Sequence, residues 1–313
     1  MENILELRDV SKNFILASHF FGSKRLLKAV NQVAFSLKPG ECLGLVGESG
    51  CGKSTLGRLA AGLLAPSQGC VLLHGKPLPL ASAKSWAKGR IQMVFQDPFS
   101  ALNPRISVGY AVGEGLRAQK KDRKTIHEEV ETMLAMVGLP NVQNRYPHEF
   151  SGGQRQRIAL AKALITKPDV VVCDEPVSAL DASVQAQVLN LLCDLQEHFS
   201  PAYLFISHDL NVVGFICQRI LVMYLGSVVE EAPTEILFNK SFHPYTKALL
   251  AARPGRPLQK ENILPGEIPS PLAPPSGCPF HPRCPEATPI CKKNAPKWHT
   301  MADNWRVRCH AAK

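Results

Sequence analysis

The chain has 313 residues, of which 45% are hydrophobic and 20% are charged, and its formal net charge is +10. No apolar run approaches the roughly 18 residues of a membrane-spanning helix, and the first ten residues lack the basic and apolar regions of a signal peptide. These features argue against integral membrane and secreted proteins and predict a cytoplasmic protein, at most peripheral to a membrane. About half of the net charge lies in residues 278–313, with seven Lys or Arg against two Asp or Glu, so we expect no nucleic-acid partner.

The first strong signal is a glycine-rich loop between a predicted strand at residues 42–46 and a predicted helix from residue 56. The segment GESGCGKST (47–55) matches the phosphate-binding P-loop pattern G-x-x-x-x-G-K-[ST], in which backbone amides and the helix dipole attract phosphate oxygens. We expect Lys53 to reach the β- and γ-phosphates and Ser54 to ligate Mg²⁺. The predicted ATP-binding residues of this loop are Gly47, Ser49, Gly50, Cys51, Gly52, Lys53, Ser54 and Thr55.

A second predicted strand precedes Gln96 in the segment IQMVFQDPFSALNP (91–104). A glutamine at a strand end can place its amide oxygen on Mg²⁺ or on the attacking water, although most such residues are merely solvated. Farther along, residues 125–140 place apolar side chains on one helical face, which predicts core packing. The members of that stripe are Ile126, Val130, Met133, Leu134 and Val137.

Residues 150–169 (FSGGQRQRIALAKALITKPD) predict a helix with Ser151 as its N-cap and with first-turn amides left open by two glycines. Such a helix end is a second potential anion site. The apolar strand at 170–174 then ends at two carboxylates, of which Asp174 is placed for Mg²⁺ and Glu175 for polarising water. A further strand at 203–206 brings His208 to the same carboxyl edge of a parallel sheet.

In this order and spacing, GESGCGKST, Gln96, FSGGQ, VVVCDEP, SALD and ISHD resemble the nucleotide-binding subunits of ABC transporters, over about residues 4–250. The resemblance implies an α/β fold with a P-loop NTPase core of the ABC type, an antiparallel β subdomain and an inserted helical subdomain at roughly 97–165. It implies an ABC domain at 1–253. A Pro-rich linker at 254–277 and a small Cys-containing C-terminal extension at 278–313 follow.

The resemblance also implies residue roles. Glu175 resembles the catalytic base and His208 the switch histidine that contacts the γ-phosphate. Phe14 resembles the aromatic that stacks on adenine, with Phe20 and Phe21 as alternatives. The implied Mg²⁺ ligands are Ser54, Gln96 and Asp174. Because two cassettes of this family dimerise head to tail, the residues expected to contact ATP held by the partner are Ser151, Gly152, Gly153, Gln154 and Asp181. Phe150 stands where the family usually has Leu, a conservative departure.

Three segments resemble the importer branch that takes up di- and oligopeptides and its nickel-uptake relatives: residues 96–105, residues 243–250 and the Pro-rich stretch that follows. The implied partners are two membrane permease subunits, a sister ABC ATPase rather than a second copy, and an extracytoplasmic solute-binding protein. The implied location is the cytoplasmic face of a bacterial or archaeal cell membrane. A nickel or metal-chelate importer is the alternative, and a non-transport ABC ATPase is the remote one.

Four cysteines close the sequence with the spacing C-x₅-C-x₆-C-x₁₇-C, at Cys278, Cys284, Cys291 and Cys309. In a reducing compartment a disulfide framework is disfavoured, and the spacing fits neither common zinc sites nor the short ferredoxin run. A similar GCPFHPRC tail occurs in peptide-importer ATPases, where some members hold a [4Fe–4S] cluster. The resemblance thus implies a possible cluster, with zinc or a metal-free packing tail as alternatives.

Overall fold

The computed structural model describes residues 2–16, 25–79, 87, 89–97, 102–253, 264 and 266–312. Its N-terminal part forms a four-stranded antiparallel sheet, in the order β2-β1-β4-β5. The strands pair through backbone hydrogen bonds. Apolar side chains alternate along them, and those on the inner face of the sheet are buried. Their bounds are β1 (Leu5–Leu16), β2 (Arg25–Leu37), β4 (Gln68–Leu73) and β5 (Lys76–Pro77). This sheet is the antiparallel β subdomain that the sequence predicts.

The second sheet has eight strands in the order β11-β12-β10-β9-β3-β8-β7-β6. Its centre is parallel, and its strands are short apolar runs that are buried on both faces, except at the edge strand β6, which is half-buried. The parallel strands are β3 (Cys42–Val46), β6 (Ile91–Val94), β7 (Val170–Asp174), β8 (Ala202–Ile206) and β9 (Arg219–Tyr224). One edge continues as the antiparallel strands β10 (Ser227–Pro233), β12 (Trp305–Val307) and β11 (His299–Ala302).

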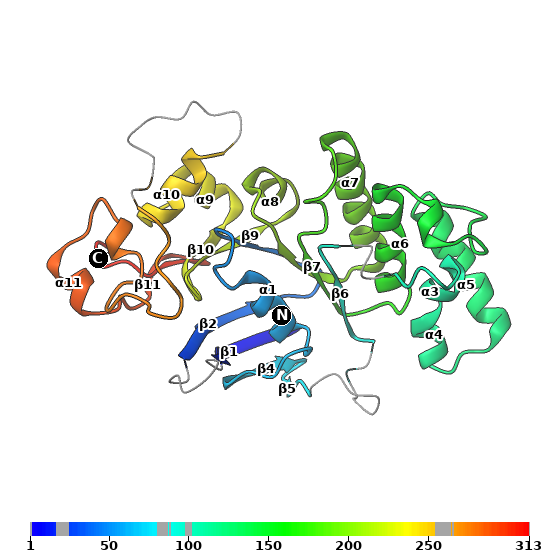
Figure 1. Cartoon of the computed structure of the whole chain (residues 1–313), viewed down its shortest axis with the longest axis horizontal. Helices are drawn as coiled ribbons and strands as arrows, with labels where there is room; N and C mark the ends of the chain where they lie inside the picture. Colours follow the sequence, from blue (N-terminus) through cyan, green and yellow to red (C-terminus); the bar gives the residue numbers. More distant parts are fainter. Residues whose placement is uncertain are drawn as a thin grey trace.

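Helix α1 (Lys53–Ala60) lies between the two sheets and packs on strands of both (Figure 1). Its apolar face joins the core that the two sheets share, which includes Leu56 and Leu59. The other face of the large sheet is covered by helices that follow its strands. These are α7 (Ala182–Phe199), α8 (Leu210–Ile216), α9 (Thr234–Lys240) and α10 (Pro244–Ala251).

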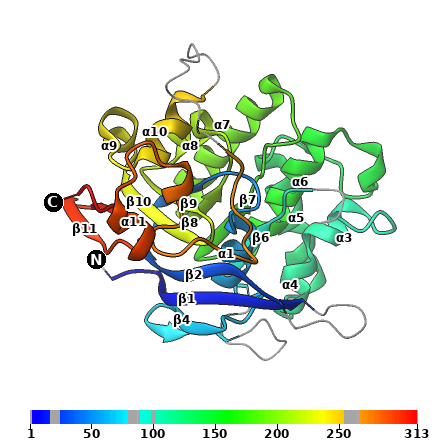
Figure 2. The same ribbon diagram turned by 60° about the vertical axis from the view of Figure 1, so that its left-hand side comes forward.

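A helical region lies between β6 and β7 in the chain and forms one end of the molecule (Figures 1 and 2). Its elements are α3 (Val108–Val112), α4 (Glu114–Ala118), α5 (Arg123–Met136), η1 (Pro147–Glu149) and α6 (Gly152–Leu164). Asp122 caps α5, and the predicted apolar stripe faces the core, since Val130, Met133, Leu134 and Val137 are buried and Ile126 packs against them. That prediction is confirmed.

The C-terminal extension forms the opposite end of the molecule and is built into the large sheet (Figure 2). It contains η3 (His281–Arg283), α11 (Pro289–Lys293), β11 and β12. Strand β12 pairs with β10, with Glu230 opposite Val307 and Glu231 opposite Arg306. The sequence did not predict this pairing. The extension therefore completes the edge of the nucleotide-binding sheet.

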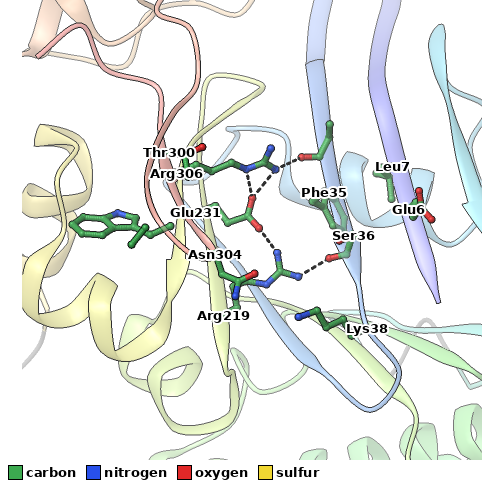
Figure 3. Close-up of a pocket in the computed structure, with 13 residues that line it drawn as sticks. Glu6, Leu7, Phe35, Ser36, Lys38, Arg219, Glu231, Thr300, Asn304 and Arg306 are labelled. Atoms are coloured by element: carbon green, nitrogen blue, oxygen red, sulfur yellow. Dashed lines mark hydrogen bonds and ion pairs between the residues drawn. The ribbon is translucent and has the colours of Figure 1, made fainter. Parts of the chain in front are cut away.

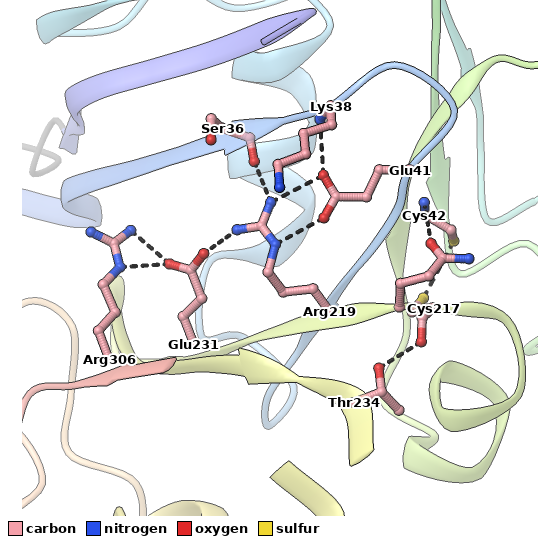
Figure 4. Close-up of polar contacts among 10 residues, drawn as sticks. Ser36, Lys38, Glu41, Cys42, Cys217, Arg219, Glu231, Thr234 and Arg306 are labelled. Carbon is pink, nitrogen blue, oxygen red and sulfur yellow. Dashed lines mark hydrogen bonds and ion pairs between the residues drawn. The ribbon is translucent and has the colours of Figure 1, made fainter. Parts of the chain in front are cut away.

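A buried ionic network joins the extension to both sheets (Figure 4). Arg219 donates to Glu41 at 2.8 Å and also pairs with Glu231, which in turn accepts from Arg306 of β12 at 2.6 Å. The two arginines also donate to backbone carbonyls of β2, at Ser36 and Ala34. Removing Arg219 would leave the largely buried carboxylate of Glu41 without its cationic partner, so the network stabilises the junction of three segments.

A pocket of about 400 Å³ opens at this junction, lined by residues of β1, β2, β9, β10 and the β11–β12 hairpin (Figure 3). Glu41, which belongs to the same junction, precedes β3, whereas the P-loop follows β3. The pocket is therefore at the opposite strand end from the P-loop. Across the described ranges, no helix combines the length and apolar content that crossing a bilayer requires.

Candidate functional site

The P-loop connects the end of β3 to the start of α1. Gly52 precedes the helix with φ 110°, and a Cβ at Gly47 would lie 2.2 Å from the carbonyl oxygen of Met223, so both positions require glycine. The Lys53 Nζ donates to the carbonyl oxygens of Gly47 at 2.7 Å and Glu48 at 3.0 Å. The lysine is only 5% exposed. Its ammonium group is therefore held inside the loop that the sequence predicts as the phosphate site.

Ser54 and Asp174 come together although 120 positions separate them. Ser54 Oγ in the first turn of α1 donates a 3.0 Å hydrogen bond to Asp174 Oδ1 at the end of β7. Asp174 is 5% exposed, and this burial raises the pKa of its carboxyl group. A hydroxyl and a carboxylate are hard oxygen donors of the kind Mg²⁺ prefers. The pair fits the predicted Mg²⁺ site beside the P-loop.

Glu175 lies between two polar side chains from neighbouring strands. Its Oε2 accepts a 3.0 Å hydrogen bond from Gln96 Nε2, and its Oε1 lies 3.3 Å from His208 Nδ1. Gln96 follows β6 and His208 follows β8, while Glu175 directly follows β7 with a positive φ of 49°. Its backbone N–H is bound to the Ile206 carbonyl at 2.9 Å. The structure thus brings Gln96, Glu175 and His208 together at one sheet edge, but places the Gln96 amide on Glu175 rather than on the Ser54–Asp174 pair.

The FSGGQ segment begins α6. Ser151 and Gln154 form a capping box: the Ser151 hydroxyl accepts from the Gln154 N–H, and the Gln154 side chain accepts from the Ser151 N–H at 3.0 Å. A Cβ at Gly153 would lie 2.3 Å from a methyl carbon of Val184, so glycine permits the close approach of α6 and α7. Asp181 caps α7 by accepting from the Val184 N–H at 2.9 Å.

Gly152 and Leu180 lie near each other: a Cβ at Gly152 would be 3.7 Å from Leu180 Cδ2. The FSGGQ and SALD segments therefore lie next to each other. Their predicted contact with ATP on a partner subunit stays a prediction, because the structure is of a single chain.

Phe14 lies in β1, where it pairs with Leu27 of β2. The ring is half-buried, and Lys12 Nζ lies 5.4 Å from its centroid. The alternatives Phe20 and Phe21 lie outside the described residues. Which aromatic stacks on adenine therefore stays a prediction.

The four C-terminal cysteines all lie in the extension, and the Cys278 N–H donates to the Cys291 carbonyl at 2.8 Å. Burial raises the pKa of the thiols of Cys278, Cys309 and Cys284, the last to about 11. Within the described ranges no three His, Cys, Asp or Glu side chains are grouped so as to hold a metal ion. All ten cysteines are free thiols. The described arrangement therefore gives the predicted iron–sulfur cluster no support.

Three residues at the P-loop were missed by the sequence reasoning: Glu48, Arg283 and Tyr245. Glu48, inside the loop, forms a bidentate ion pair with Arg283 of the extension, at 2.8 and 3.1 Å. The phenol oxygen of Tyr245 in α10 accepts the Glu48 N–H at 2.9 Å. The partners of Glu48 are about 200 positions away or more, and no spacing rule would have paired them.

Comparison with known proteins agrees with this geometry. The family profile described as ABC transporter matches residues 30–178, and the profile described as Oligopeptide/dipeptide transporter, C-terminal region, matches residues 229–291. The chain is similar to the "Oligopeptide transport ATP-binding protein AppF" of Bacillus subtilis (strain 168), at 49% identity over 99% of this chain and 97% of the relative. The chain belongs to the ABC transporter ATP-binding family. It is therefore an ABC-type ATPase, and its nucleotide is ATP.

Other relatives of this ABC ATPase include the "Oligopeptide transport ATP-binding protein OppF" of Haemophilus influenzae, at 47% identity over 98% of this chain and 97% of the relative. The "Di/tripeptide transport ATP-binding protein DppF" of Pseudomonas aeruginosa is 44% identical over 100% of this chain and 99% of the relative.

Solved structures with the same fold include cbiO1 of Clostridium perfringens, part of the cbiONQ transporter complex, with a TM-score of 0.65 and 27% identity over 77% of this chain and 93% of that one. The ATP-binding cassette MJ0796 bound to ADP and phosphate gives a TM-score of 0.64 and 26% identity over 74% and 98%. These neighbours confirm the predicted P-loop core of the ABC type.

Proposed function

We propose that this ABC ATPase powers the import of di- or oligopeptides through separate membrane permease subunits, at the cytoplasmic face of a prokaryotic cell membrane. The carrying observation is that residues 229–291 match the profile of the oligopeptide/dipeptide transporter C-terminal region in the same chain as the ABC profile. The full-length similarity to ATP-binding proteins named for peptide transport supports the same cargo.

The proposed site has a division of roles between neighbouring loops. Lys53 and the P-loop amides would hold the phosphates of ATP, and Ser54, Gln96 and Asp174 would hold Mg²⁺, which when bound offsets the phosphate charge. Glu175 takes a proton from the attacking water. His208 and Gln96, both in contact with that carboxylate, orient it, and His208 contacts the terminal phosphate. Support for these roles is the convergence of four strand ends on one edge of the sheet.

We further propose that the cassette works as a dimer, in which Ser151, Gly152, Gly153, Gln154 and Asp181 contact the ATP held by the other subunit. The adjacency of Gly152 and Leu180 supports a joint surface for that contact. A sister ABC ATPase is the preferred partner, and an extracytoplasmic solute-binding protein delivers the cargo.

Reconstitution with two permeases, a sister ATPase and a binding protein tests this function. The expected result is ATP hydrolysis that rises on adding a labelled tripeptide, together with its uptake into proteoliposomes. Stimulation by nickel or a metal chelate instead would favour the alternative importer. Full hydrolysis without stimulation by either cargo, and without association with permeases, would favour a non-transport ATPase.

The [4Fe–4S] proposal for Cys278, Cys284, Cys291 and Cys309 rests on the sequence resemblance alone, and no step of the ATP chemistry depends on it. Anaerobic purification followed by iron, sulfide and zinc analysis tests it. About four iron atoms per chain, with visible absorption that the Cys284→Ser variant loses, would establish a cluster. Stoichiometric zinc or a colourless, metal-free protein would establish the alternatives.

A further inference from the structure

Glu48 is a residue of the P-loop that distant parts of the chain hold in place. Its carbonyl oxygen accepts from Lys53 Nζ at 3.0 Å, and its N–H donates to the phenol oxygen of Tyr245 at 2.9 Å. Its carboxylate accepts hydrogen bonds from both terminal nitrogens of Arg283. Glu48 is thus held at its backbone N–H, its carbonyl oxygen and its carboxylate. Two of those three contacts come from residues beyond α9.

Arg283 is itself held firmly. It is the last residue of the short helix η3, and Phe280 is the N-cap of that helix. Phe280 is 1% exposed, and its ring packs against those of Tyr224 and Tyr245 at centroid distances of 5.2 and 5.4 Å. The Arg283 N–H donates to the Phe280 carbonyl at 3.0 Å. The guanidinium group therefore projects from an anchored turn of the extension.

The ion pair is also well shielded. The Arg283 side chain is 7% exposed and that of Glu48 is 23% exposed. A bidentate, partly desolvated arginine–carboxylate pair is stronger than an exposed one and is costly to break on one side only. Breaking it would leave a carboxylate uncompensated within the loop that must receive the negatively charged phosphates of ATP. Arg283 therefore neutralises a charge that would oppose nucleotide binding.

We propose that Arg283 is a positioning residue of the ATP site, which acts through Glu48 to fix the P-loop and to cancel the loop's own negative charge. The C-terminal extension is by this inference a working part of nucleotide binding. The inference rests on the proposed ATP site around Lys53.

The experiment measures the Kd of the full-length chain for Mg·ATP by calorimetry, and KM and kcat in the reconstituted transporter. Arg283→Met is expected to raise Kd and KM about tenfold, as the loss of one partner of a shielded pair implies, with kcat within about twofold because Glu175 is not touched. The double variant Glu48→Gln/Arg283→Met should recover most of that loss, since no unpaired carboxylate remains. Arg283→Lys should fall between wild type and Arg283→Met.

Glu286→Gln is the matched control. It removes another ion pair between the extension and α10, Lys247–Glu286 at 3.7 Å, whose side chains are about half exposed (51% and 52%). It should leave Kd unchanged. The deficit of Arg283→Met should also shrink as salt rises from 0.05 to 0.5 M, because screening weakens repulsion by Glu48.

Wild-type affinity in Arg283→Met would overturn the inference, and so would a double variant as weak as Arg283→Met. If Arg283→Met does not fold, Arg283→Lys and the double variant decide: wild-type Kd in Arg283→Lys together with loss of binding in the double variant would also reject it. Failure of the proposed ATP site is separate, since it would appear as unchanged binding in Lys53→Ala.

Discussion

The side-chain amide of Gln96 donates to one oxygen of Glu175 while the imidazole of His208 lies against the other, at 3.0 and 3.3 Å. Both partners follow strands that flank β7, so the register of the parallel sheet places them. A carboxylate with both oxygens engaged has a fixed direction at the edge where the P-loop lies. The sheet thus preorganises the residue proposed to activate water.

Replacement of that carboxylate tests its role. Glu175→Gln should lower kcat for ATP hydrolysis by at least about 100-fold, because the amide cannot accept a proton. Its Kd for Mg·ATP should stay within about threefold of wild type, since Lys53 and Ser54 are untouched. Single-turnover hydrolysis and equilibrium binding measure the two effects, and near-normal turnover would reject Glu175 as the base.

The Ser54–Asp174 contact predicts coupled effects on magnesium dependence. Asp174→Asn should raise the Mg²⁺ concentration for half-maximal hydrolysis by about 10- to 100-fold, because a charged oxygen ligand is lost. Ser54→Ala should act in the same direction. The double variant should lose less than the two single effects combined, because the two side chains contact each other. Full additivity in Mg²⁺ titrations would contradict a shared site.

His243 predicts a pH dependence of folding. Burial lowers the pKa of its imidazole to about 3, and its Nδ1 accepts the Tyr245 N–H at 3.1 Å as the N-cap of α10. The unfolded chain takes up this proton near pH 6.5, so it binds more protons than the folded chain between that pH and about 3. Stability should therefore fall as pH drops through this window, by about 1.4 kcal/mol per pH unit from this residue.

His243→Asn tests that assignment, because asparagine keeps a capping oxygen but does not titrate in this range. The free energy of unfolding, measured in guanidinium chloride at pH 7 and pH 5, should fall by about 2 kcal/mol less in the variant than in wild type. Equal losses in the two proteins would show that other groups carry the acid sensitivity.

The close approach of α6 and α7 gives a stability prediction with a neighbouring control. A Cβ at Gly153 would lie 2.3 Å from Val184 Cγ1, whereas at Gly152 the nearest atom is 3.7 Å away. Gly153→Ala should lower the free energy of unfolding by about 1–3 kcal/mol. Gly152→Ala should change it by less than about 0.5 kcal/mol. Equal effects in chemical denaturation would contradict the packing argument.

The motifs of the ATP site could be predicted because each occupies a strand end or a helix start that local pattern reveals. Glycine spacing, apolar runs and the Asp174-Glu175 pair suffice to place the P-loop and the strand that follows FSGGQ. The direction of the Gln96 amide could not be predicted, since it depends on which neighbour lies within hydrogen-bond reach. The four C-terminal cysteines likewise suggested a shared metal site, but the described residues form no metal-binding group.

Where the extension packs also could not be predicted from the sequence. Strand β12 has only three residues, Trp305, Arg306 and Val307, which is too short for a period-two pattern to stand out. Its partner is determined by buried contacts, such as those from Arg306 to Glu231 and from Trp305 to Glu230. Proline-rich composition at 254–277 predicts a linker, and it carries no information on the hydrogen bonds that join β12 to β10.

The pairing of β10 with β12 has a consequence for biosynthesis. Glu230 is made 77 residues before its partner Val307, so the β10 edge of a largely formed sheet stays open while the ribosome adds the intervening segment. Open strand edges recruit other chains. Nascent copies therefore expose an unpaired strand edge during this interval, and the pairing of β12 with β10 ends that exposure.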